Sequence, residues 1–154
     1  MIHAMAEYIF YEGRIHHYVE LLDELNRGVH FAVLPDGQAV QHADPHTLLW
    51  HAAGANMESV GVELLVPGVY DLGGLYTKIH SKWQYPKAQY IGLLNIMSFL
   101  DDTGYLIGKH ATPNGQKFSW DYHSTQSRGR KKDPGSSFNQ HIWMNMLEGR
   151  FDGK

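Results

Sequence analysis

The sequence predicts an α/β domain in which a central mixed β-sheet is flanked by helices. Strand-like segments alternate with segments of helical periodicity along the chain, a pattern typical of sheets covered by helices. Residues 59–66, SVGVELLV, are nearly all apolar and β-branched, with Glu63 as their only ionisable residue. This composition predicts a central strand buried on both faces. With 154 residues, 43% of them apolar, we expect a single domain spanning residues 1–154.

The first predicted elements are a short strand and a helix. Residues 1–5 have strand character and are followed by a loop that reaches Gly13. Apolar residues then recur at helical spacing in the segment 18–25, before Asn-Arg-Gly, which is a helix stop signal. We place His16 and His17 at the beginning of this helix.

A β-hairpin is predicted next. Residues 29–34 and 38–41 are separated by Pro-Asp-Gly, which favours a tight turn between two strands. The histidine-rich segment 42–56 is expected to be a loop, and it leads into the buried strand. His30, within the first strand of the hairpin, is more typical of a hydrogen-bonded core histidine than of a ligand.

The second half predicts two helices and one further strand. Residues 67–85 are rich in glycine and aromatic residues and are expected to form a long loop. Pro86 is a favourable first residue for a helix that ends at the Asp-Asp-Thr-Gly stretch 101–104. Residues 105–108 predict a short strand, and residues 138–149 predict an amphipathic C-terminal helix that ends at Gly149.

Composition excludes several classes of protein. The formal net charge is −3, so the chain lacks the basic excess that binding to nucleic acid normally needs. The absence of cysteine removes disulfides and thiolate chemistry. The N-terminus does not have the pattern of a secretion signal, and no segment approaches the length of a membrane span. We expect a monomer that is made in the cytoplasm.

The stretch 123–138, HSTQSRGRKKDPGSSF, brings an imidazole, a cation and a carboxylate into one loop. Asp133 lies in an Asp-Pro-Gly turn that leads towards a helix, so it is expected at a rigid corner. His123 precedes Asp133 by ten residues and Lys131 by eight. The alternative interpretation is that the RGRKK run is a solvated basic surface and His123 a surface histidine.

The chain resembles a known family through four motifs, which are IHAMAE, VHFAVLPDG, WHAAGANMESVGVELL and HSTQSRGRKKDPGSSF. Their order and spacing are similar to those of the zinc-dependent N-acetylmuramoyl-L-alanine amidases of the amidase-2 type. These enzymes share their fold with peptidoglycan recognition proteins and phage lysozyme-amidases. The resemblance implies that His3, His123 and Asp133 are zinc ligands, that Glu63 is the catalytic carboxylate, and that Lys131 stabilises the transition state.

The chain departs from the family pattern in two places. Val29 stands where some members have a tyrosine, so a phenol has no role there. The segment before His123 is longer than usual, so His110 competes with His123 as the second metal ligand. We prefer His123 because its spacing to Lys131 and Asp133 fits the pattern.

The ligand chemistry supports the resemblance independently. Two imidazoles and one carboxylate leave a fourth tetrahedral position open for water, as in catalytic zinc sites. A carboxylate on a buried strand near a cation is suited to moving a proton, which describes Glu63. The alternative for Glu63 is a carboxylate that faces water on an edge strand.

Further residues are assigned to the substrate or to other roles. The predicted substrate contacts are His51, Asn56, Tyr70 and Trp83. Aromatic side chains of this kind stack on sugar rings or simply pack in the core. A second metal cluster of His42, His46 and His51 is an alternative, although three histidines in a loop are more often solvated or hydrogen-bonded.

Three functions follow from these observations. The first is a zinc amidase that cuts peptidoglycan between N-acetylmuramic acid and L-alanine, either as a phage or prophage endolysin or, alternatively, as a recycling enzyme acting on soluble anhydro-muropeptides. We favour the endolysin. The second is a zinc-free peptidoglycan-binding module of the same fold. The third is an unrelated α/β protein with an incidental histidine-rich surface.

Overall fold

A computed structural model describes residues 1–71, 83–104, 120–126, 131 and 133–151. Its centre is a five-stranded sheet in the order β2-β1-β5-β3-β4. The central strand β5 pairs in parallel with β1 and β3, whereas β2 and β4 pair antiparallel with β1 and β3. The strands are β1 (Ile2–Tyr11), β2 (Arg14–His17), β3 (Phe31–Val33), β4 (Ala39–Gln41) and β5 (Val62–Asp71).

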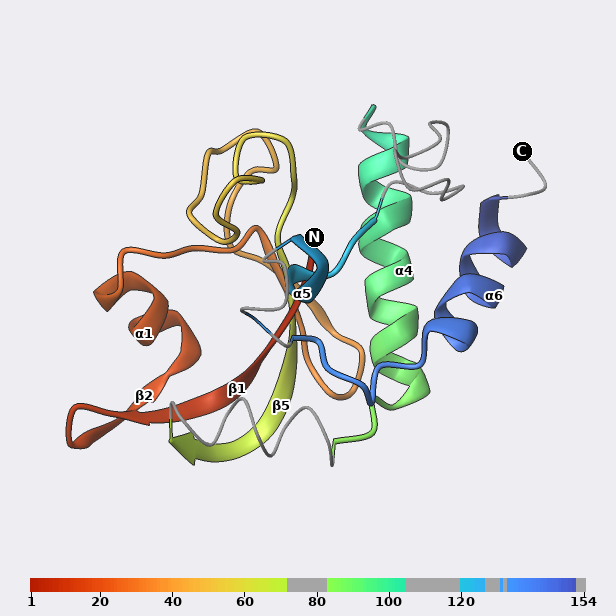
Figure 1. Ribbon diagram of the computed structural model, residues 1–154. Helices are drawn as coiled ribbons and strands as arrows, with labels where there is room; N and C mark the ends of the chain where they lie inside the picture. Colours follow the sequence, from red (N-terminus) through yellow and green to blue (C-terminus); the bar gives the residue numbers. More distant parts are fainter. Residues whose placement is uncertain (72–82, 105–119, 127–130, 132, 152–154) are drawn as a thin grey trace.

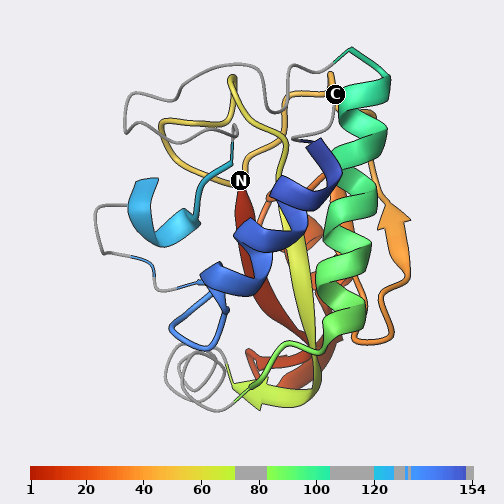
Figure 2. The same ribbon diagram turned by 90° about the vertical axis from the view of Figure 1, so that its right-hand side faces the viewer.

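Helices cover both faces of the sheet, as Figures 1 and 2 show. Helix α1 lies on one face, and α4 and α6 lie side by side on the other. The helices are α1 (Tyr18–Glu24), α4 (Lys87–Asp102), α5 (His123–Gln126) and α6 (Gln140–Phe151). The predicted mixed sheet with flanking helices is therefore confirmed. None of the helices described is both long and apolar enough to cross a membrane.

Each face of the sheet has its own hydrophobic core. Leu64 on β5 packs with Leu93 of α4 and Trp143 of α6. On the opposite face, Leu65 packs with Leu21 of α1. This alternation follows from the strand period of two, which turns adjacent residues of β5 to opposite faces. The buried strand predicted at residues 59–66 is thus central to both cores.

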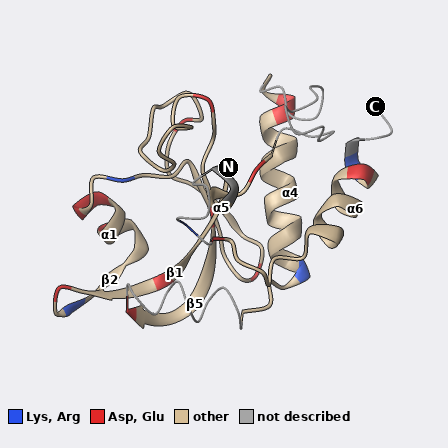
Figure 3. Cartoon of the chain, in the orientation of Figure 1, with Lys and Arg blue, Asp and Glu red and all other residues tan. Residues whose placement is uncertain are grey.

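Helix α4 approaches the sheet closely at Gly92, and its buried face is uncharged. Its charged residues lie only at its two ends (Figure 3). Gly92 faces the β3–β4 hairpin, where an added Cβ would lie 2.6 Å from a methyl group of Val33. The buried amide of Gln89 donates to the carbonyl oxygens of Val33 and Leu65, at 3.2 and 2.7 Å. These contacts fix the helix against β3 and β5.

The predicted loop before Gly13 is wrong, because β1 continues to Tyr11 and turns back into β2. The central residues of this hairpin, Glu12 and Gly13, both have positive φ, at 48° and 83°, as the common two-residue hairpin turn requires. The aromatic residues of β1 also favour a strand. His16 and His17 consequently lie in β2 rather than in the first helix.

The predicted loop 67–85 begins too early, since β5 extends to Asp71. The register with β1 shifts between Ala6 and Tyr8, so Pro67 lies at a bulge, where its missing N–H is tolerated. The remainder of the loop at residues 72–82 and the strand predicted at 105–108 lie outside the described residues. The predicted ends of the two later helices are nearly correct. Pro86 is the N-cap of α4 rather than its first residue, and α6 continues two residues past Gly149.

Candidate active site

The candidate site forms where β1 and β5 run side by side. His3 and Glu63 are partners in the parallel register of these two strands, so both side chains lie on the same face of the sheet. This is the face that carries α1. Both residues are buried, and Glu63 exposes only 7% of its surface.

The C-terminal segment reaches the same place through a bridge to β1. Tyr122 forms an isolated parallel bridge with Ile2, and the Ile2 amide donates to the carbonyl oxygen of Asp121 at 2.8 Å. His123 therefore emerges beside His3, although it begins the short helix α5 rather than lying in the loop that we predicted. The Ser124 amide donates to the carbonyl oxygen of Asp133 at 3.1 Å.

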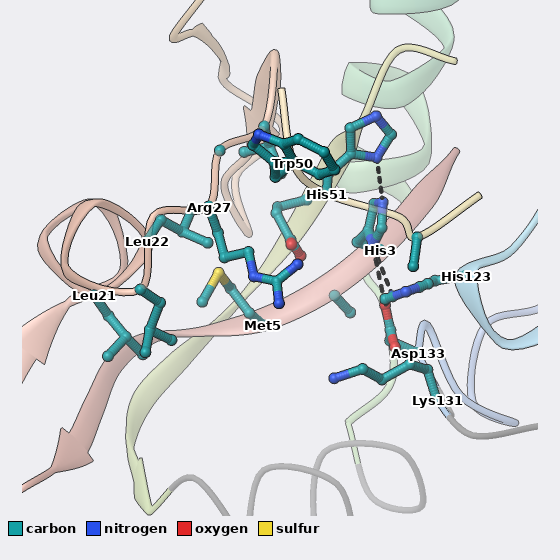
Figure 4. A pocket seen from close by; sticks show the side chains of 16 residues that line it. His3, Met5, Leu21, Leu22, Arg27, Trp50, His51, His123, Lys131 and Asp133 are labelled. Atoms are coloured by element: carbon teal, nitrogen blue, oxygen red, sulfur yellow. Dashed lines mark hydrogen bonds and ion pairs between the residues drawn. The ribbon is translucent and has the colours of Figure 1, made fainter. Parts of the chain in front are cut away.

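These connections bring His3, His123 and Asp133 into one cluster (Figure 4). The Nδ1 atoms of the two histidines are 3.0 Å apart. Oδ2 of Asp133 lies 2.9 Å from Nδ1 of His123 and 3.3 Å from Nδ1 of His3. One ligand-type atom from each residue lies within 4.8 Å of the others.

The environment sets the charge of the cluster. Burial lowers the pKa of His3 to about 4, despite the opposing effect of Asp133. Burial alone would raise the pKa of Asp133, but its interactions with His123 and His3 outweigh this and lower it. His3 is therefore neutral and Asp133 ionised at neutral pH, which are the forms that bind metals.

The donor atoms suit a divalent metal. Two imidazole nitrogens and a carboxylate oxygen are the ligand set of many catalytic zinc sites. Without a cation, these three electron-rich atoms must share a proton to lie so close together, and a metal ion would satisfy all three. The residues that could hold a metal are therefore His3, His123 and Asp133.

Glu63 lies beside the cluster with unsatisfied hydrogen-bonding capacity. Its Oε2 atom is buried and has no hydrogen-bond partner among the described residues. Burial raises the pKa of Glu63 well above its ordinary value, and the charge of Asp133 adds to this effect. Lys131 acts in the opposite direction. An isolated, perturbed carboxylate of this kind is typical of active sites.

A cavity of about 400 Å³ contains the cluster. In Figure 4 it extends from Lys131 and Asp133 at one end to the leucines of α1 and to Arg27 at the other. Its lining residues are His3, Ala4, Met5, Leu21, Leu22, Leu25, Arg27, Gly28, Val29, Trp50, His51, Ala53, Glu63, His123, Lys131 and Asp133. The cavity thus combines an apolar end with a polar, metal-type end.

The predicted substrate contacts separate into two groups. His51 lines the cavity. Asn56 holds the backbone of His51 in place, because Oδ1 of Asn56 accepts hydrogen bonds from the amides of His51 and Ala52. Tyr70 and Trp83 do not line the cavity and pack against the hydrophobic cores instead. Substrate contact by these two aromatic residues stays a prediction that the geometry does not favour.

The remaining histidines occupy other positions. His42 bonds to the Tyr18 hydroxyl at 2.6 Å and His46 is exposed, and neither joins His51 in a metal-type group within the described part of the chain. His30 is a buried core residue, as predicted. The competing ligand His110 lies outside the described residues.

Sequence reasoning missed the apolar end of the cavity. Arg27 and Trp50 line it together with α1, yet Arg27 was interpreted only as part of a helix stop. The apolar spacing of residues 18–25 carried this signal, since Leu22 and Leu25 both line the cavity, although Leu22 also packs against the core that contains Leu21.

A cavity that combines metal-type ligands, a buried carboxylate and a lysine defines a candidate metal-dependent hydrolase. The chain belongs to the N-acetylmuramoyl-L-alanine amidase family (Amidase_2), whose model matches residues 2–136. A solved structure described as "crystal structure of Se-Met AmpD derivative" is similar with a TM-score of 0.60 and 17% identity, covering 95% of this chain and 83% of that chain. At this identity the likeness establishes the fold. A search of curated proteins found no match.

Proposed function

We propose that this protein is a zinc-dependent N-acetylmuramoyl-L-alanine amidase, with His3, His123 and Asp133 as the zinc ligands. The observation that carries this proposal is the convergence of their three ligand-type atoms within 4.8 Å, beside the buried Glu63. Family membership supports the choice of bond, an amide between N-acetylmuramic acid and L-alanine. When bound at such a site, zinc polarises a carbonyl and lowers the pKa of a bound water to about 7.

Glu63 is proposed as the group that moves the proton. Hydrolysis of an amide requires a base that accepts a proton from water and then returns it to the leaving nitrogen. The pKa of Glu63 is raised by burial and by Asp133, so its carboxylate is a stronger base than an exposed glutamate. Its free Oε2 is the atom that would accept and deliver the proton.

Lys131 is proposed to stabilise negative charge on the substrate oxygen. It lines the same cavity as His3, Glu63 and Asp133, and its charge already influences Glu63. A cation beside the reacting bond stabilises negative charge that develops there, and the partial burial of Lys131 reduces its screening by water.

For the substrate, we propose polymeric peptidoglycan, attacked by an endolysin that is made in the cytoplasm and acts on the wall after release. Trp50 supports a saccharide ligand: it lines the cavity and exposes 57% of its surface, and such indole faces stack well on sugar rings. We propose that the enzyme acts as a monomer. Recycling of soluble anhydro-muropeptides is the alternative.

The amidase proposal is tested with purified protein that has been stripped with a chelator and reloaded with zinc. Digestion of peptidoglycan should release peptides with a new L-alanine amino terminus, only after reloading, with about one zinc per chain. A protein stripped by chelator and returned to buffer without zinc is the matched control. Binding to peptidoglycan without zinc and without new L-alanine termini would instead support a binding module.

A further inference from the structure

His51 is hydrogen-bonded to a proposed metal ligand on one side and to the backbone on the other. Nδ1 of His51 lies 3.1 Å from Nε2 of His3, and Nε2 of His51 lies 3.0 Å from the carbonyl oxygen of Ser59. A carbonyl oxygen only accepts hydrogen bonds. The proton of the neutral His51 ring must therefore be on Nε2, which leaves Nδ1 as an acceptor.

This arrangement determines where His3 carries its own proton. Since Nδ1 of His51 accepts, Nε2 of His3 must donate, and Nδ1 of a neutral His3 is left with a free lone pair. That atom is the one that lies 3.0 Å from Nδ1 of His123 and 3.3 Å from Oδ2 of Asp133. The chain from Ser59 through His51 thus presents the correct nitrogen of His3 to the cluster.

We propose that His51 is a positioning residue, which holds His3 in the tautomer and ring orientation that binds the metal. This inference rests on the proposed zinc site. It adds a role for His51 other than substrate contact. Both ring nitrogens of His51 are occupied by His3 and Ser59. A hydrogen bond to substrate would therefore require breaking one of them.

The position of His51 is itself fixed from several directions. Its backbone amide donates to Oδ1 of Asn56 at 3.0 Å. Gly61 lies directly under the ring, where an added Cβ would be 2.8 Å from both Cγ and Nδ1 of His51. The ring of His30 contacts that of His51 edge to face at 5.6 Å. Groups that orient metal-binding histidines in this way influence affinity by about 10- to 100-fold when they are removed.

His30 does not extend this chain of hydrogen bonds. Its Nδ1 accepts from the amide of Gly61 at 3.0 Å, and its Nε2 donates to the carbonyl oxygen of Thr47 at 2.8 Å. His30 therefore orders the backbone beneath His51 and makes no hydrogen bond to His3, whose Nε2 atom contacts His51.

The first test measures the tautomers directly in the wild-type, metal-free protein at slightly alkaline pH. Nitrogen NMR of ¹⁵N-histidine-labelled protein distinguishes protonated from unprotonated ring nitrogens. We expect His3 and His51 each to be protonated on Nε2 and unprotonated on Nδ1. A proton on Nδ1 of His3 would overturn the proposal. This measurement needs no zinc and no variant, so its result is independent of whether the protein is an amidase.

The second test compares zinc affinity by competition with a chelating dye. His51→Ala should weaken zinc binding by about 10- to 100-fold and leave His3 in a mixture of tautomers. His51→Gln should restore most of the affinity, because its side-chain oxygen and amide can replace the acceptor and the donor. His46→Ala, in the same loop but away from the cavity, is the control.

Each outcome of this comparison is decisive. Wild-type affinity and an unchanged His3 tautomer in His51→Ala would overturn the positioning role. A wild-type protein that binds no zinc would contradict the proposed function, but it would leave the tautomer result standing. If His51→Ala fails to fold, the wild-type tautomers and the His51→Gln protein decide the question.

Discussion

His3 and Glu63 face each other in the parallel register of β1 and β5. Backbone hydrogen bonds between these two strands therefore set the spacing of His3 and Glu63, whatever the conformation of the loops. Pre-organisation of this kind is important for catalysis, since small displacements of reacting groups are costly. The other two cluster residues, His123 and Asp133, depend on the bridge between Tyr122 and Ile2.

The first prediction concerns the metal ligands. Alanine at His3, His123 or Asp133 should abolish stoichiometric zinc binding and activity, because a site with three protein ligands cannot lose one. Zinc content is measured after gel filtration, together with circular dichroism to show that each variant folds.

His110→Ala is the informative control for this experiment. It should retain zinc, because His3, His123 and Asp133 by themselves supply the three ligand-type atoms of a catalytic zinc site. If His123→Ala retained one zinc per chain while His110→Ala lost it, the assignment of the second ligand would be wrong.

The second prediction is that Glu63→Gln keeps the fold and the zinc but lowers turnover by about 100-fold or more, the usual scale for loss of a general base. Glutamine keeps the shape of the side chain and removes its basicity. Turnover is measured on the zinc-loaded protein with metal content determined in the same sample. Wild-type turnover at full zinc occupancy would remove Glu63 from the mechanism.

The third prediction separates the two effects of Lys131. Lys131→Met should reduce turnover by about 100-fold through loss of transition-state stabilisation. Because Lys131 holds the pKa of Glu63 down, its removal should also raise that pKa further. The acid limb of the pH–rate profile should then move to higher pH. A profile that loses height without moving would show that Lys131 does not influence Glu63.

Much of the fold was predictable because local signals and tertiary packing agree. The run around Glu63 is apolar enough to specify a central strand, and the turn at Pro35-Asp36-Gly37 forms a hairpin with β3 and β4, as expected. The helix stop after Leu25 and the N-cap at Pro86 are local chemistry as well. The positions of these turns and helix ends can be predicted without knowing which distant residues they contact.

The sequence predictions fail where residues far apart in the chain determine the local structure. The strand β1 is long because β5 pairs along its whole length, through Pro67 to Asp71. A proline and glycine in sequence suggest a loop, but the bulge opposite Glu7 accommodates them. For the site, the hydrogen bond between His51 and His3 joins residues 48 positions apart, and spacing in sequence does not contain that information.

The fourth prediction is a loss of stability in mild acid for the metal-free protein. Burial lowers the pKa of His3 to about 4 and that of His51 to about 3. Between the unfolded value of about 6.5 and these values, the unfolded chain binds more protons than the folded protein. The contribution of His3 to stability should therefore be fully present above about pH 6.5 and be lost as the pH decreases towards 4, by about 3 kcal/mol. The raised pKa of Glu63 acts in the opposite direction over this range, so the histidine contribution is read from the difference between the wild type and a variant that lacks it.

Urea unfolding of the metal-free protein at neutral pH and at about pH 4.5 measures this loss. His3→Gln, which cannot titrate, should lose less stability between the two conditions than the wild type. An equal change in urea midpoint between the two pH values for the wild type and for His3→Gln would show that His3 is not buried in its neutral form.

The last prediction concerns the substrate. The cavity extends from the metal-type cluster to the exposed Trp50 and the leucines of α1, which places an aromatic face beside the proposed zinc site. We therefore expect the zinc form to release stem peptides from intact peptidoglycan sacculi. The matched assay offers the same enzyme a soluble anhydromuramyl peptide, and Trp50→Ala, which should keep its zinc, should lose more activity on sacculi than on that peptide. Efficient cleavage of the soluble compound with no release from sacculi would contradict the endolysin and establish a recycling amidase in its place.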